Sequence, residues 1–426
     1  MNGSSLPPVP PGGEIAWVRS HLRDLCCDEP TRSPRFRGTQ QAADDALGSF
    51  DVSGYAATRN EVFPRGRRGA SGLSPWIRHG LLSLPAVWVS VTGPSRDVAK
   101  FRDELLWQEY SRHLYARVGY ATARPLRFEP WRNSTDSPDP WDRSLACVDL
   151  AVTELESDGW LVNQTRMWLA SQWTVRHGAG WRDGEDLFFT HLLDGSRAAN
   201  RLGWMWTIGA GTGKSYGFSR WQVKKRAPGL CDRCTHRHRC PIESWPPERA
   251  LEPATEPKNL RGTGDPKRFA GPLRSALHRD PSVVWLTAES LGEHDPALRA
   301  HPDLPTLFIF DEPLLERLML SGKRLVFLAE RLSEIGRTRE LTIIRGRPSE
   351  VLATANAATT FAPVPGWRRI ADDVELAAIH PWPWLRQPDG GSLASFSTWR
   401  DRTERGDDGA RTEGPAPTGT EGPADR

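Results

Sequence analysis

Hydrophobic and polar positions divide the chain into two parts with different periods. From about residue 36 to 220, apolar residues recur at spacings of three and four, as in Phe101–Leu114 (FRDELLWQEYSRHL) and Gln164–Val175 (QTRMWLASQWTV). This spacing is typical of one face of a helix. A strand-like run appears at Ala86–Val91 (AVWVSV). The pattern predicts an all-α region with few strands.

The pattern changes after a segment rich in proline and charge, residues 246–280, which we interpret as a linker. Three short apolar runs follow, VVWLTA (283–288), TLFIFD (306–311) and LTIIR (341–345), with an amphipathic segment at 317–335. Short, nearly continuous apolar runs are typical of buried parallel strands. Their alternation with a helix predicts a doubly wound α/β sheet.

Both ends of the chain have the composition of disordered segments. Residues 1–35 carry Pro-Pro and Pro-Gly with scattered charge, and residues 401–426 repeat Thr-Glu-Gly-Pro-Ala. We therefore expect five parts in chain order: a disordered segment (1–35), an all-α domain that includes a cysteine cluster (36–245), a linker (246–280), an α/β domain (281–400) and a disordered tail (401–426).

Composition favours a cytoplasmic protein without a membrane partner. The mean hydropathy is -0.54, and no run approaches the roughly 20 apolar residues of a membrane span. The amino end has no signal-peptide layout. The net charge of +3 does not by itself predict nucleic-acid binding. Two basic clusters, Arg65–Arg68 and Lys224–Arg226, are either phosphate-facing patches or ordinary solvated faces.

Cysteine and tryptophan are distributed unevenly. Three of the six cysteines are Cys231, Cys234 and Cys240, a spacing that favours a metal site over disulfides in a cytosolic protein. Cys26 and Cys27 lie near the amino end and are weaker ligand candidates. Most of the 19 tryptophans fall in the first 245 residues. Core packing, base stacking and electron transfer are the alternative explanations.

Four motifs of the helical part occur together in one order. They are GASGLSPWIRHGLLS (69–83), ELLWQE (104–109), WRDGE (181–185) and DGSRAANRLGWMW (194–206). Their sequence and spacing resemble the cryptochrome/photolyase family. The resemblance implies an all-α, FAD-binding, photolyase-type domain.

The carboxyl part resembles the family's amino-terminal domain, through VVWLTAESLGEHDPAL (283–298), SGKRLVFLAERLSEI (321–335) and GRPSEVL (346–352). The resemblance thus implies a Rossmann-like, doubly wound α/β antenna-type domain placed after the FAD-binding domain, in permuted order. It also implies an antenna chromophore, whose identity the sequence does not specify.

The resemblance assigns residues to the flavin. Asn200 falls at the flavin N5, where a neutral amide can hydrogen-bond the reduced, anionic ring, and Arg166 and Asp194 fall at an ion pair against the ring. The expected FAD contacts are Tyr55, Ser71, Gly72, Leu73, Ser74, Arg166, Asp194 and Asn200. The expected electron relay is Trp204, Trp181 and Trp131, with Trp141 as the alternative third member.

A second residue set matches the lesion pocket of the family. Its members are Glu104, Trp107, Asn163, Met167 and Trp206. They imply a lyase that repairs cyclobutane pyrimidine dimers in damaged DNA, driven by blue light through electron transfer from reduced FAD. The resemblance specifies no protein partner.

Departures from the family pattern favour other functions. Gln108 and Gln164 stand where the family commonly has arginines, and the net charge is near zero. These features favour a cryptochrome-like light sensor without repair activity. A flavin and iron–sulfur redox protein without light function is the third hypothesis.

The cysteines also match a branch of the family. Cys231, Cys234 and Cys240-Pro241 resemble the ending of the iron–sulfur photolyases, and Cys147 falls at the fourth ligand. Four thiolates are the usual ligands of a [4Fe–4S] cluster. The alternatives are structural zinc that uses His236 or His238 with the three clustered cysteines, and unligated thiols.

Overall fold

The computed structural model describes residues 3–132, 140–263 and 265–412, with the backbone alone from residue 405 onward. The helices of the amino-terminal part are α1 (Glu14–Leu22), α2 (Gln40–Gly48), α3 (Tyr55–Thr58), α4 (Ser74–Arg78), α5 (Leu84–Ser90), α6 (Ser95–Val118), α7 (Ala146–Asp158), α8 (Asn163–Ala170), α9 (Trp181–His191), α10 (Ala199–Thr207) and α11 (Arg220–Arg226). Those of the carboxyl part are α12 (Lys267–Ala270), α13 (Pro296–Ala300), α14 (Glu312–Leu318), α15 (Gly322–Thr338), α16 (Pro348–Leu352), α17 (Pro365–Asp373) and α18 (Phe396–Thr412).

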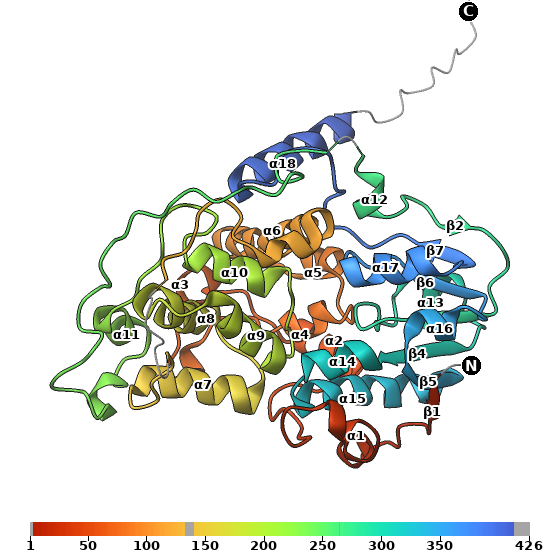
Figure 1. Cartoon of the computed structure of the whole chain (residues 1–426), viewed down its shortest axis with the longest axis horizontal. Coiled ribbons are helices and arrows are strands. Elements are labelled where there is room, and N and C mark those ends of the chain that lie inside the picture. Colours follow the sequence, from red (N-terminus) through yellow and green to blue (C-terminus); the bar gives the residue numbers. More distant parts are fainter. Residues whose placement is uncertain (1–2, 133–139, 264, 413–426) are drawn as a thin grey trace, which may run out of the picture.

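The carboxyl part builds a mixed sheet (Figure 1). Its strands are β1 (Ser4–Leu6), β2 (Ala276–Leu277), β3 (Val283–Leu286), β4 (Thr306–Asp311), β5 (Leu341–Gly346), β6 (Ala357–Thr360) and β7 (Ala378–His380). The spatial order is β1-β5-β4-β3-β6-β7-β2. The five central strands are parallel, and β1 and β2 are antiparallel at the two edges. The predicted strands at 283–288, 306–311 and 341–345 are confirmed.

Alternate residues of the sheet face two separate helix layers. Phe308 and Phe310 of β4 pack with α1 and α15, whereas Leu307 and Ile309 of the same strand pack with α16 and α17. A strand with period two that is apolar on both faces must be covered on both faces. This is the doubly wound arrangement that the sequence predicts.

The prediction of a disordered segment is wrong for residues 3–35; residues 1–2 lie outside the described part. Ser4–Leu6 pairs with Ile343–Arg345 of β5, and α1 packs against α15. The buried carboxylate of Glu330 on α15 also binds Arg32 and Arg37. The proline and glycine content suggested a disordered segment. Its partners are instead far along the chain: the edge of β5, which pairs with β1, and the buried carboxylate of Glu330.

The carboxyl end returns to the helical part instead of ending with the sheet. Helix α18 packs against α6, where the Trp399 indole N–H donates to His113 Nδ1 at 3.1 Å. The Glu109 carboxylate of α6 accepts from the backbone N–H groups of Leu385 and Arg386. The prediction that disorder begins at residue 401 is wrong for 401–412, which are helical; residues 413–426 lie outside the described part.

Two local predictions also differ from the structure. Residues 86–91, expected as a strand, belong mainly to α5, because Ser83 caps Ala86 N–H at 3.2 Å and Pro85 occupies the first turn. The linker contains α12 and β2, and β2 completes the sheet edge beside β7. At residues 86–91 the helix-start signals outweighed the β-branched composition. In the linker, pairing with β7 outweighed the proline-rich composition.

The helical part forms its own core, but the boundary between the two parts is shared. Helices α7 to α11 enclose one apolar cluster, whereas α4 and α5 pack in the same cluster as α15 and strands β3 and β4. Across residues 3–132, 140–263 and 265–412, no helix has both the length and the apolar character needed to cross a membrane.

Candidate functional site

A cavity of about 570 Å³ lies in the helical part and reaches the sheet region. Its wall includes Glu289, Leu314 and Trp382 from the sheet region. Seven arginines but three carboxylates line it: Arg59, Arg78, Arg112, Arg166, Arg182, Arg197 and Arg201, with Glu104, Asp194 and Glu289. The size is that of a small-molecule or cofactor site, and the excess of arginine favours an anionic occupant.

Arg166 and Asp194 form a bidentate ion pair on this wall. Arg166 Nη1 and Nη2 donate to the two carboxylate oxygens of Asp194 at 3.1 and 2.7 Å, and Arg166 Nε donates to Leu161 O at 3.0 Å. Asp194 is buried. Because three of the five N–H groups of the guanidinium are bonded, the orientation of the pair is fixed before any ligand arrives.

The amide of Asn200 has one defined orientation. Its Oδ1 accepts from Ser196 N–H at 2.7 Å, and the residue lines the cavity at the start of α10. This hydrogen bond leaves Nδ2 as the donor of the amide. Asn200 therefore closes a turn through Oδ1 and also lines the cavity.

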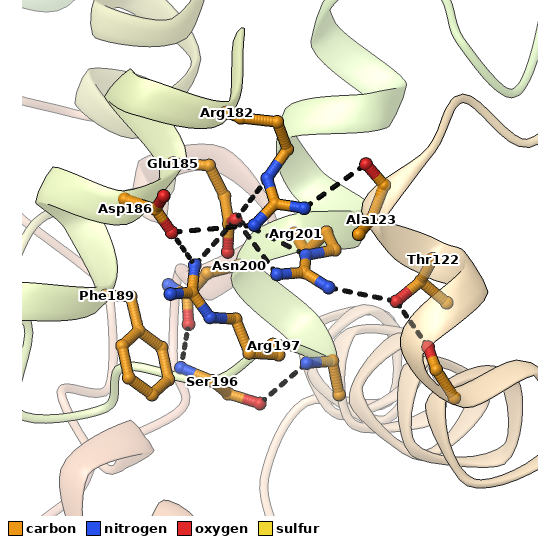
Figure 2. Close-up of polar contacts among 12 residues, drawn as sticks. Thr122, Ala123, Arg182, Glu185, Asp186, Phe189, Ser196, Arg197, Asn200 and Arg201 are labelled. Atoms are coloured by element: carbon orange, nitrogen blue, oxygen red, sulfur yellow. Dashed lines mark hydrogen bonds and ion pairs between the residues drawn. The ribbon is translucent and has the colours of Figure 1, made fainter. Parts of the chain in front are cut away.

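A buried carboxylate organises three arginines of the wall (Figure 2). Glu185 is fully buried, and its Oε2 receives Arg197 at 2.7 Å, Arg201 at 3.2 Å and Arg182 at 3.4 Å. Arg201 Nη1 also donates to Thr122 Oγ1 at 3.1 Å. Asp186 also pairs with Arg197 at 2.5 Å and with Arg182 at 3.6 Å. Two carboxylates cannot neutralise three guanidinium groups, so this part of the wall keeps a net positive charge.

Most of the predicted flavin and lesion residues meet in this one cavity. On its wall lie Tyr55, Ser71, Gly72, Ser74, Glu104, Trp107, Asn163, Met167, Arg166, Asp194, Asn200 and Trp204. Glu104 Oε1 contacts Arg59 Nε at 3.2 Å and Lys100 Nζ at 3.1 Å. The Trp107 ring packs against Phe396 of α18 at 5.1 Å between centroids.

Two predicted contact residues lie away from the wall. Leu73 is fully buried in the apolar core, and its N–H donates to Ser71 Oγ at 3.4 Å. Trp206 is 40% exposed and packs against Tyr216. On a helix, two residues separated by two positions point in nearly opposite directions, so Trp204 faces inward and Trp206 outward on α10.

The aromatic path from Trp204 differs from the expected relay. A Cβ added to Gly184 would lie 2.3 Å from Trp204 and 2.9 Å from Trp173, so both indoles pack against this glycine. Trp173 lies in a π-helical turn, Ser171–Arg176, and its ring centroid is 4.9 Å from that of Trp141. Trp173 is a residue that the sequence analysis missed.

Among the described residues, neither of the other two predicted relay members has a ring contact with Trp204, Trp173 or Trp141. Trp181 is buried beside the Arg182 guanidinium, and Trp131 packs under Arg249 at 3.8 Å. Phe188 also bridges Trp204 and Trp141, with centroid distances of 5.2 and 5.9 Å. The structure thus brings Trp141 near the proximal tryptophan, and the ring contact found for Trp131 is with Arg249.

The four predicted metal-ligating cysteines come together. Cys147, Cys231, Cys234 and Cys240 line one cavity of about 20 Å³ between α7 and the segment after α11. Cys234 Sγ accepts from Ala146 N–H at 3.5 Å. Burial, followed by the neighbouring thiolates, raises the pKa of the Cys147 thiol to about 12. Four converging thiols, with Arg220 beside Cys231, form a set suited to a metal centre.

The comparisons with known proteins agree with this geometry. Residues 101–227 match the family model of the FAD binding domain of DNA photolyase. A deoxyribodipyrimidine photo-lyase of Thermus thermophilus is 36% identical over 222 residues, which cover 49% of this chain and 51% of that protein. The helical part of the chain is thus similar to the FAD-binding domain of the DNA photolyases.

Other relatives in the family show the same partial overlap. A deoxyribodipyrimidine photo-lyase of Synechococcus is 29% identical over 43% of this chain and 40% of its own length. The solved class III photolyase of Agrobacterium tumefaciens is 28% identical, covers 39% of this chain and 37% of its own, and has a TM-score of 0.34. The chain thus spans about half or less of the relatives it matches.

The cavity also contains charged residues that the sequence analysis did not identify. Arg197 and Arg201 lie four apart within the flavin motif, and Glu185 ends the WRDGE motif. The sequence shows that all three residues occur in these motifs. Only the fold shows that both arginines form ion pairs with the buried Glu185. In the basic cluster 65–68, which was one of two candidate phosphate-facing patches, Arg65 and Arg68 form ion pairs with the buried Glu154. These two arginines therefore have partners inside the protein.

Proposed function

We propose that this chain is a blue-light-driven, FAD-dependent lyase that splits cyclobutane pyrimidine dimers in DNA. One observation carries the proposal: residues matching the family's flavin contacts and residues matching its lesion pocket line a single cavity. When bound and reduced, FAD would supply one electron to the dimer on excitation, and the electron would return after the ring splits.

The chain's own residues would first bind and orient the flavin. The arginines around Glu185 would attract its phosphates, while the Arg166–Asp194 pair would fix a guanidinium beside the ring. Asn200, whose Oδ1 is already bonded to Ser196, would donate from Nδ2. These groups are held by protein partners, so they need little reorganisation on binding.

The lesion residues would hold the flipped dimer against this flavin. Trp107 would stack on the bases, and Met167 would pack beside them. Asn163 and Glu104 would hydrogen-bond the thymine edges, with the Glu104 carboxylate accepting from a ring N–H. The dimer stacks and pairs poorly in duplex DNA, so flipping it costs less than flipping an intact pair.

Photoreduction of oxidised flavin would use the aromatic path already described. Trp204 would donate an electron to the excited flavin. Trp173 would then reduce the oxidised Trp204, and Trp141 would reduce the oxidised Trp173. An added thiol reductant would supply the electron that Trp141 loses. The 4.9 Å contact of Trp173 with Trp141 and the shared packing against Gly184 support this order.

The cysteine cavity supports a [4Fe–4S] cluster more than zinc. Tetrahedral zinc, with bonds of about 2.3 Å, holds its sulfurs about 3.8 Å apart. Among the described residues, no three of these thiols lie within 4.8 Å of one another. A [4Fe–4S] cluster is a cube with irons at four alternate corners, and each iron binds one thiolate, so the cluster suits the wider spacing.

Light sensing without repair is the second candidate, and the exposure of Trp206 favours it. One of the two expected stacking walls faces away from the cavity.

For the sheet region, the proposal of an antenna chromophore rests on the family resemblance alone.

The deciding experiment measures repair directly. Oligonucleotides containing a thymine dimer are illuminated with blue light in the presence of fully reduced protein, and recovery of thymine absorbance is followed. We expect wild type to repair the dimer and Trp107→Ala to lose most of this activity. Glu104→Ala should lose more of the repair yield per absorbed photon than of the affinity for damaged DNA. The matched control Trp206→Ala should change little in either quantity. Absence of repair, with equal binding to damaged and intact DNA, would establish the sensor instead.

A further inference from the structure

A second set of metal-ligating side chains lies far along the chain from the cysteine cavity. Cys27 and Asp28 follow α1, and His191 is the last residue of α9. One ligand atom of each lies within 4.8 Å of those of the other two. In the part of the chain that the structure describes, this is the one set of three such residues that meets this spacing.

The backbone around the set is fixed by three chain segments. Cys27 N–H donates to Leu320 O at 3.1 Å, and Ser321 N–H donates to Thr190 O at 3.0 Å. Asp28 Oδ1 accepts from Gly322 N–H at 2.6 Å. The amino-terminal segment, the end of α9 and the start of α15 are therefore joined at this point, and the side chains converge on a rigid frame.

His191 Nδ1 lacks a hydrogen-bond partner although it is buried. Its nearest acidic atom is Asp28 Oδ2 at 3.8 Å, which is too long for a hydrogen bond. Two ligands of one tetrahedral zinc are separated by about 3.3 to 3.8 Å, depending on whether oxygen, nitrogen or sulfur is bound. The separation fits two ligands of a shared ion better than it fits a direct contact.

The protonation states suit a metal that displaces one proton. Burial lowers the pKa of His191, so its imidazole is neutral and offers a lone pair. Burial, followed by the Asp28 carboxylate, raises the pKa of the Cys27 thiol to about 11. Lys323, the nearest ammonium on α15, donates to the backbone oxygen of Glu156. A thiolate and a carboxylate together balance the charge of a divalent ion.

We propose that Cys27, Asp28 and His191 bind one zinc ion, with water in the fourth position, and that this ion fastens the amino-terminal segment to α9 and α15. The mixture of sulfur, nitrogen and oxygen selects zinc over magnesium or calcium, which prefer oxygen alone. Cys27 is exposed, which leaves the open position accessible. The site is separate from the four-cysteine cavity and does not depend on flavin or DNA.

The test compares zinc content in the full-length protein and matched variants, all prepared in the same way. After incubation with zinc and removal of the excess, we expect wild type to hold one equivalent more than Cys27→Ser and His191→Gln. The controls are Cys26→Ser, whose thiol bonds Leu22 O inside the core, and His278→Gln on the exposed surface. Both should retain the wild-type amount.

Thermal unfolding supplies the second readout. Added zinc should raise the melting temperature of wild type and of both controls, and leave Cys27→Ser and His191→Gln unchanged, because a ligand stabilises only the state that binds it. Cobalt(II) in place of zinc should show a thiolate charge-transfer band that Cys27→Ser loses. Equal zinc content in all five proteins, or no thermal shift in wild type, would overturn the proposal.

Discussion

The arginine-lined cavity and the cysteine cavity prepare for their occupants in opposite ways. In the first, Asp194 and Glu185 are buried, and each is already paired with arginine side chains. In the second, four thiols surround about 20 Å³, and each thiolate would raise the pKa of Cys147. The buried carboxylates of the first cavity already have arginine partners, whereas the thiols of the second would gain a shared partner from a metal ion. We therefore expect flavin loss to spare the fold and metal loss to weaken it.

The largest effect should come from the cysteine cavity. Cys147→Ala should lose iron and acid-labile sulfide, and its melting temperature should fall by on the order of 10 °C, because structural metal sites contribute folding free energy. Metal analysis and thermal unfolding measure both. The control His236→Ala should keep its metal, since His236 is a ligand only in the zinc alternative. Retention of metal by Cys147→Ala would mean that Cys147 is not a ligand.

Arg166→Ala should act on the flavin more than on the fold. Breaking a buried ion pair by removing one partner costs about 3–5 kcal/mol, and part of that cost should appear as FAD binding weakened at least about tenfold. Flavin absorbance of the purified protein reports occupancy, and circular dichroism reports folding. Arg279→Ala, which removes a partner of the exposed Glu375, is the control with full flavin content. Equal occupancy in both variants would contradict the assignment.

Tryptophan variants separate the two possible relays. Trp204→Phe should abolish blue-light photoreduction while FAD stays bound, because the first electron donor is missing. Trp173→Phe and Trp141→Phe should slow photoreduction, whereas Trp131→Phe should leave it unchanged. Flavin absorbance under illumination with a thiol reductant measures the rate. A loss in Trp131→Phe but not in Trp141→Phe would restore the relay expected from sequence.

The smallest effect concerns pH and Glu109, which lies between α6 and the segment 385–386. Burial raises the pKa of Glu109 to about 7, although Arg112 and two backbone N–H groups oppose the shift. Between its ordinary value of 4.5 and about 7, the folded chain holds a proton that the unfolded chain has lost. This contribution to stability is present at low pH and disappears as pH rises through 7.

Glu109→Gln should remove that dependence. From pH 5 to 8, wild type should lose at most about 3 kcal/mol relative to the variant, measured as the free energy of unfolding in denaturant. Burial holds the pKa of His113 near 3 in both proteins, so the difference isolates Glu109. Glu248→Gln, on the exposed surface, should follow wild type at every pH. A parallel pH profile for Glu109→Gln would refute the assignment.

The sequence predicted the elements whose partners lie nearby. Strands β3, β4 and β5 read as apolar runs because both of their faces are covered, and α15 as an amphipathic helix. The sequence pattern could not predict in this way that the residues of β1 and α1 are ordered. Their stability comes from Glu330 and from the edge of β5, about 300 residues further along.

The motifs predicted many of the residues that line the cavity, but not the direction of every side chain. Motif positions identified Arg166, Asp194 and Asn200, which do line one cavity. They did not show that α10 turns Trp206 outward, or that a π-helical turn brings Trp173 beside Trp141. Helix rotation and irregular turns change side-chain direction without changing the motif.

The pairing of β1 with β5 has a consequence for the order of synthesis. Ser4–Leu6 leaves the ribosome long before residues 341–346, with which it pairs. From the emergence of β5 until β1 docks, this edge of β5 has no strand beside it, and open edges favour association between chains. These hydrogen bonds of the sheet therefore connect residues that are synthesised far apart in time. A bulky fusion at the amino terminus should slow that closure and increase aggregation during expression, whereas a fusion at the other end should not.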